Sequence, residues 1–98
     1  MCYYASMIKK DLRQWATIYR GLGNPNRLKI LKLLSSREKM SVSELSDELG
    51  ISLKNTSRNL GILLNLDFVQ NEGKHDRVYY SLNLRLPEDI NRILKVTL

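Results

Sequence analysis

Few residues in this chain could carry out covalent or metal chemistry. The 98 residues include one cysteine, Cys2, and one histidine, His75. A single cysteine excludes an internal disulfide and a thiolate metal cluster within one chain. With one histidine, the usual zinc sites and nucleophile–base pairs cannot be assembled either. We therefore expect no catalytic residue, no metal and no cofactor.

A segment rich in hydrogen-bond donors indicates a different chemistry, the recognition of DNA bases. A guanidinium can pair with guanine and an asparagine amide with adenine when a helix enters the major groove. Arg58 is the best single candidate for such a contact. The alternative is an ordinary solvated helix face. The full set that we expect to contact DNA is Lys54, Asn55, Ser57, Arg58 and Asn59.

A second basic group lies in a polar stretch between two β-type segments. Lys74, His75 and Arg77 could contact phosphates or enter a minor groove from the tip of a hairpin. Glu72 and Asp76 offset the charges of the lysine and the arginine, so the tip is neutral unless the histidine is protonated. A DNA contact and an ordinary polar turn are equal alternatives here.

The first donor set must be carried by a helix whose start is marked by a cap. Ser52 can cap this helix, and Ser41 with Glu44 forms a capping box for a shorter helix before it. Gly50 can adopt the left-handed conformation that ends the shorter helix. Two short helices joined in this way predict a helix-turn-helix. The side chains expected to bury the second helix are Leu53, Thr56, Leu60 and Leu63.

The remaining elements complete a recognisable order. Asn24 and Pro25 begin a helix that runs to about Ser35, and residues 68–70 and 78–82 form the two strands of a hairpin with a polar tip over residues 71–76. Helices at about 5–22 and 88–98 lie at the two ends. The predicted fold is mainly α with a small β-hairpin, a winged helix-turn-helix of order α-α-α-α-β-β-α.

The two terminal helices carry apolar stripes that a domain of this size cannot fully bury. We expect these stripes to form a two-fold dimer interface. The alternative is that both helices pack on their own core. The expected interface consists of Ile8, Leu12, Trp15, Tyr19, Ile90, Ile93 and Leu94.

Composition and charge agree with a single soluble module over residues 1–98. Sixteen basic and ten acidic residues give a net charge of +6, which favours polyanionic partners. No apolar run approaches the roughly 20 residues of a membrane-spanning helix, and residues 1–5 lack the pattern of a secretory signal. We expect a cytoplasmic protein without a membrane partner.

The motifs together resemble the ArsR/SmtB family of winged-helix repressors over nearly the whole chain. Asn24, Pro25 and Arg27 match the Asp or Asn, Pro, any residue, Arg pattern that opens the family's second helix. The resemblance implies a homodimer that binds a pseudo-palindromic DNA operator. The segments that carry it are residues 21–31, 43–52, 56–60 and 72–82.

The chain departs from this family at both of its metal sites. Residues 41–43 read Ser-Val-Ser where metal-sensing members carry Cys-x-Cys, and hydroxyls are poor ligands for soft metals. The last helix has Asp89 but no histidine. The expected function is therefore that of a sequence-specific DNA-binding transcriptional regulator that acts as a repressor and whose signal is not a metal.

A winged-helix adaptor that binds another protein is the alternative function. Leu64 on the edge of the donor-bearing helix, Gly61 within that helix and the neutral hairpin tip favour it. The absence of acidic residues between Ser52 and Leu66 favours DNA instead.

Overall fold

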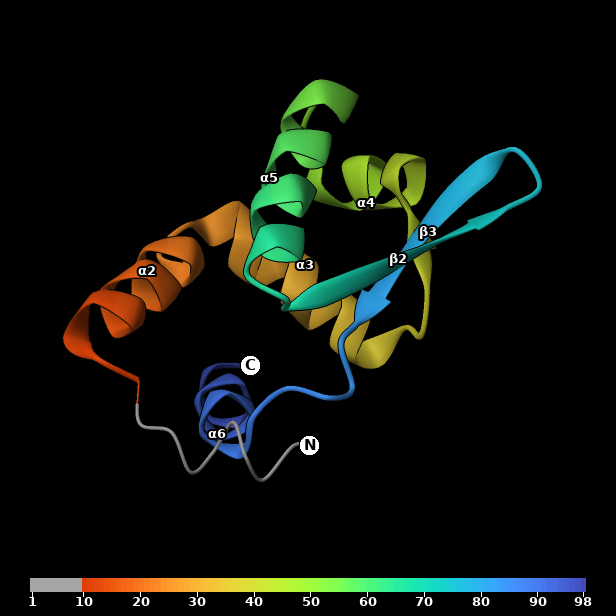
Figure 1. The fold of residues 1–98 in the computed structure, drawn as a ribbon. Helices are drawn as coiled ribbons and strands as arrows, with labels where there is room; N and C mark the ends of the chain where they lie inside the picture. The colour runs from red at the N-terminus through yellow and green to blue at the C-terminus, as the bar shows by residue number, and fades with distance from the viewer. Residues whose placement is uncertain (1–9) are drawn as a thin grey trace.

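Capping side chains mark the starts of most helices in the computed structural model, which describes residues 10–98. Asp11 with Gln14 and Ser41 with Glu44 form capping boxes, and Asn24 accepts hydrogen bonds from two amides of the next turn. The expected second, third, fourth and last helices are all confirmed. The elements are α2 (Leu12–Leu22), α3 (Pro25–Ser36), β1 (Met40–Ser41), α4 (Val42–Leu49), α5 (Leu53–Asn65), β2 (Val69–Lys74), β3 (Arg77–Leu82) and α6 (Glu88–Thr97) (Figure 1).

The helix-turn-helix is formed by α4 and α5, whose junction is held by short local contacts. Gly50 has φ +68°, the left-handed conformation expected of it. The buried hydroxyl of Ser46 donates a hydrogen bond of 2.6 Å to the carbonyl oxygen of Ile51. Ser52 then caps α5 by accepting from the amide of Asn55 at 3.0 Å. These contacts set the turn between the two helices.

The hairpin belongs to a three-stranded antiparallel sheet of order β1-β3-β2. β1 was not expected from the sequence, because two residues carry no strand pattern and pair only through their register with Tyr79 and Tyr80. The turn of the hairpin is also shorter than expected. Lys74 pairs with Arg77, so only His75 and Asp76 lie between the strands. The hairpin extends away from the helices as the wing of a winged helix (Figure 1).

One apolar core joins the helix-turn-helix, the sheet and α6. Phe68, at the start of the hairpin, is 1% exposed and lies among the largest fully buried side chains. The other residues of this core are Leu22, Ile30, Leu31, Leu34, Met40, Leu45, Leu60, Leu63, Val69, Ile90 and Leu94.

Two details of the expected helices are wrong. The first described helix starts at Leu12 rather than near residue 5, because Asp11 is its extended N-cap. Leu53 does not share the buried stripe of α5, since 55% of its surface is exposed. Thr56, Leu60 and Leu63 are fully buried as expected.

No helix within residues 10–98 has both the length and the apolarity needed to cross a membrane.

Two glycines give opposite predictions for stability. Gly50→Ala should lower the free energy of unfolding by about 1–2 kcal/mol, because an L side chain is strained at its positive φ. Gly61→Ala should raise it by about 0.5–1 kcal/mol, because Gly61 lies inside α5 and a Cβ there meets no atom within 4 Å. Urea denaturation at one protein concentration measures both. Equal effects of the two substitutions would contradict the left-handed cap.

Candidate nucleic-acid interface

The outer side of α5 presents polar donors to solvent. Lys54, Asn55, Ser57 and Arg58 are all exposed, as expected from the sequence. The start of α5 lies at one edge of the molecule, beside α4 and on the side remote from α6 (Figure 1). A helix that begins at an edge in this way can bring its first turns into a groove.

The charge on this face is purely positive. α5 contains Lys54 and Arg58 and no carboxylate. Neither cation forms an ion pair with a carboxylate of residues 10–98. Both charges are therefore available to an external anion such as a phosphate, and the planar guanidinium can also bind two acceptors on one base edge.

Asn59 is not part of the exposed donor set, so its predicted placement there is wrong. Only 5% of its surface is exposed. Its side-chain oxygen accepts a hydrogen bond of 2.9 Å from Nη1 of Arg27. Its Nδ2 donates to the backbone oxygen of Asn55 at 3.0 Å and contacts Oδ1 of Asn55 at 3.4 Å. Asn59 thus connects the core side of α5 to the exposed Asn55.

Arg27 contacts α5 from the side that faces the core. Its Nε donates to the carbonyl oxygen of Gly21, and its Nη2 donates to the carbonyl oxygen of Arg20 at 3.2 Å. The guanidinium therefore links the last turn of α2, the first turn of α3 and the middle of α5. Sequence analysis included Arg27 in a motif but assigned it no role, because its partners are distant in sequence.

Gly21 allows α2 to approach the end of α5. A Cβ on Gly21 would lie 2.1 Å from Cδ1 of Leu66, closer than two such atoms can come without a shift of that side chain. Leu66 follows the last turn of α5. The same junction between α2 and α5 is thus fixed by a close apolar contact and by the Arg27 hydrogen bonds.

The wing carries its basic residues at its tip. Lys74, His75 and Arg77 are exposed, and His75 has φ +61°, as the two-residue turn requires. Glu72, which the charge count had set against these cations, lies 2.7 Å from Nζ of Lys39 instead. Asp76, which lies in the turn itself, is the acid nearest in sequence to Lys74, His75 and Arg77.

The contact between Lys39 and Glu72 changes both pKa values. The hydrogen bond between the two side chains raises the pKa of Lys39 and lowers the pKa of Glu72, and their opposite charges act in the same direction. Both groups are solvated, so the pair contributes little to stability. It does connect the β2 side of the wing to the loop before β1.

Two residues of the expected dimer surface are buried within the monomer. Ile90 and Leu94 are 4% and 7% exposed and belong to the core of the monomer, so their placement on an outer face is wrong. They face inward because α6 uses them to attach to the core. Ile93 is half-buried and packs against the same core. Ile8 lies outside the described residues.

The α2 part of the expected surface is more open. Leu12 is 87% exposed and Tyr19 is 56% exposed. Trp15 is half-buried and stacks on Tyr19, with ring centroids 5.8 Å apart. These three side chains form an apolar strip along α2, in which Leu12 and Tyr19 are exposed while Trp15 also packs against the core.

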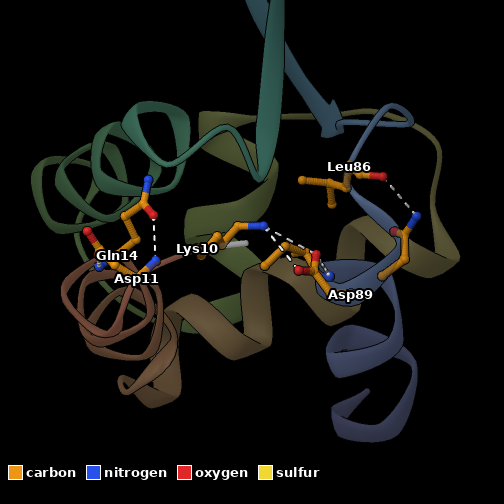
Figure 2. Close-up of polar contacts among 7 residues, drawn as sticks. Lys10, Asp11, Gln14, Leu86 and Asp89 are labelled. Atoms are coloured by element: carbon orange, nitrogen blue, oxygen red, sulfur yellow. Dashed lines mark hydrogen bonds and ion pairs between the residues drawn. The ribbon is translucent and has the colours of Figure 1, made fainter. Parts of the chain in front are cut away.

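A lysine joins the start of α2 to α6. Nζ of Lys10 contacts both carboxylate oxygens of Asp89, at 3.1 and 3.3 Å (Figure 2). The same ammonium lies 5.4 Å from the centroid of the Trp15 ring, within the range of a cation–π contact. Asp89, which had been considered as a remnant of a metal site, therefore pairs with a lysine.

One of the observations that favoured a protein-binding adaptor is not supported by the structure. Leu64 was expected on the polar side of α5 or at its edge. It is half-buried and packs against the core, so it is not the exposed apolar side chain that a docking surface requires. Gly61 is exposed on the outer face, as that alternative assumed.

Comparisons with known proteins agree with this arrangement. Residues 22–70 match the profile of a family described as "Helix-turn-helix domain". The transcriptional repressor SdpR of Bacillus subtilis (strain 168) is 29% identical over 72 residues, which cover 74% of this chain and 79% of the repressor.

Two solved structures share the fold. The homodimeric winged helix-turn-helix DNA-binding domain Mb0332 from Mycobacterium bovis, described as a possible ArsR-family transcriptional regulator, has a TM-score of 0.72 and 29% identity. That match covers 91% of this chain and 83% of the other. NolR from Sinorhizobium fredii has a TM-score of 0.75 and 27% identity, covering 86% of this chain and 80% of its own.

The Arg27–Asn59 contact predicts a coupled pair of substitutions. Arg27→Ala and Asn59→Ala should each destabilise the protein, and the double substitution should cost about 1 kcal/mol less than the sum, because both remove the same charged hydrogen bond. Urea denaturation of the four proteins measures this coupling. Ser57→Ala combined with Arg27→Ala is the control, since Ser57 is exposed on the same helix and should show additive effects. Additivity for Arg27 and Asn59 would refute the contact.

Proposed function

Because the chain belongs to the helix-turn-helix domain family and has the winged fold of ArsR-type DNA-binding transcriptional regulators, we propose that it is a repressor that binds an inverted-repeat operator as a homodimer. The exposed, acid-free face of α5 is the observation that carries this proposal. In this role α5 enters the major groove and no covalent chemistry takes place.

We assign recognition of the DNA base sequence to the polar side chains of α5. Arg58 can donate two hydrogen bonds to the O6 and N7 acceptors of guanine, and the amide of Asn55 suits adenine. Ser57 can pair with either, and Lys54 supplies a flexible charge for a base or a phosphate. Asn59 is excluded from this set because Arg27 and Asn55 already occupy its polar atoms.

The wing is assigned to the DNA backbone. Lys74 and Arg77 are opposite each other at the last pair of the hairpin, with His75 in the turn between them. Lys39 pairs with Glu72 and so adds a positive charge beside the wing, although Lys74 still lies near Glu72 and Arg77 near Glu44. Contacts to phosphate position a protein on DNA without reading its sequence.

Dimer formation is assigned to the apolar strip of α2, formed by Leu12, Trp15 and Tyr19, together with Ile93 on α6. Exposed apolar side chains on a small domain favour association with a second copy through a two-fold axis. The homodimeric relative Mb0332 supports this assignment, and the repressor SdpR supports the direction of regulation. Two recognition helices would then address half-sites about 34–36 Å apart.

The remaining expectations concern cellular location, metals or cofactors, and domain organisation. We assign the protein to the cytoplasm, where a DNA-binding regulator of this kind would meet its operator. That no metal or cofactor takes part, and that residues 1–98 act as one domain, remain predictions.

Arg58→Ala should remove the preference of the protein for its own operator. We expect a loss of about 1–3 kcal/mol per half-site, because a bidentate contact with a base is lost. Fluorescence anisotropy with labelled duplexes from the region upstream of its gene and with random duplexes, over a salt series, measures the preference. Arg85→Ala is the matched control, because it removes the same charge from an exposed position in the loop before α6. Equal losses for both variants would show that α5 contributes only non-specific electrostatic attraction to DNA.

Leu12→Asp should convert the dimer to monomers and weaken operator binding. A carboxylate in the apolar strip would be buried without a partner if the dimer formed. Light scattering gives the mass directly. Val78→Asp, at an exposed position of the wing, should leave the mass unchanged. A dimeric Leu12→Asp protein would show that α2 is not the interface.

A further inference from the structure

The first turn of α5 contains an apolar side chain where the proposed DNA interface is otherwise polar. Leu53 is the first residue of the helix, and 55% of its surface is exposed. The core-facing side of α5 is formed by Thr56, Leu60 and Leu63, each fully buried. The apolar atoms of Leu53 are therefore not used to hold α5 on the core.

Exposure of one leucine would by itself mean little, since single apolar residues are common on protein surfaces. Its neighbours make the position of Leu53 informative. Ser57 lies one turn further along the same side of the helix, and Lys54 and Arg58 lie beside these two on the outer face. Leu53 thus lies between the buried stripe of α5 on one side and the side chains to which base contacts are assigned on the other, at the helix end that would enter the groove first.

The bases of DNA offer one apolar group in the major groove. The 5-methyl group of thymine projects there, beside the O4 acceptor, and only an apolar side chain can remove it from water favourably. The ammonium, hydroxyl and guanidinium ends of lysine, serine and arginine cannot make that contact, although the methylene stems of lysine and arginine are apolar. We propose that Leu53 packs against the methyl group of a thymine in each half-site, and so favours a T·A pair at that position. This inference rests on the proposed function.

The contact between Leu53 and the thymine methyl group should have a measurable effect on DNA affinity. Burial of one methyl group against an apolar side chain corresponds to about a fourfold change in affinity per half-site. Replacement of that thymine by uracil removes the methyl group and leaves the hydrogen-bonding edge unchanged. Leu53→Ala removes the other partner of the same contact.

The experiment combines both changes. A preferred duplex is first selected from a random library with the wild-type protein, and each of its thymines is then replaced by uracil in turn. We expect one thymine per half-site whose replacement weakens wild-type binding about fourfold and leaves binding by Leu53→Ala unchanged. Lys54→Ala is the matched control, and it should bind more weakly overall but keep the sensitivity to uracil.

The outcomes separate this inference from the proposal on which it rests. A preferred duplex whose uracil forms affect wild type and Leu53→Ala equally, or affect neither, would overturn the role of Leu53 alone. If no duplex is preferred over random DNA, the proposed function fails, and the role of Leu53 with it. Leu53→Ala should fold normally because its side chain is half exposed, and circular dichroism checks this.

Discussion

The position of α5 depends on one guanidinium. Arg27 donates to two carbonyl oxygens at the end of α2 and to the buried oxygen of Asn59 in α5. The carbonyl end of a helix carries partial negative charge, so a cation is favourable there. A planar group with several donors can join three helices at one point, which a lysine could not do in the same geometry. The outer face of α5 is presented from this fixed junction.

α5 shows how one helix separates stability from recognition. Thr56, Leu60 and Leu63 hold its inner side in the core, while Lys54 and Arg58 remain free of carboxylates among residues 10–98. Unpaired cations on a solvated surface cost little in the free protein and attract a polyanion over a distance set by salt. In the wing, by contrast, Glu72 pairs with Lys39 and also lies near Lys74, so the wing combines cations with a nearby acid.

The terminal helices combine two tasks that the sequence pattern could not separate. Ile90 and Leu94 attach α6 to the core, whereas Leu12 and Tyr19 on α2 remain exposed. An amphipathic stripe indicates only that one side of a helix is shielded from water. Whether it meets its own core or a second copy depends on how many apolar side chains the core can accept, and here α6 is taken into the core while much of α2 is not.

Local chemistry by itself determined where α3, α4 and α5 begin, the left-handed turn at Gly50 and the order of elements that defines a winged helix. These features depend on residues a few positions apart, so capping oxygens and apolar spacing suffice to predict them. Tertiary structure decided the strand β1, the burial of Asn59 and the exposure of Leu53. The rotation of a helix about its axis is set by its neighbours, here through Arg27, and residues at the edge of a stripe can therefore fall on either side.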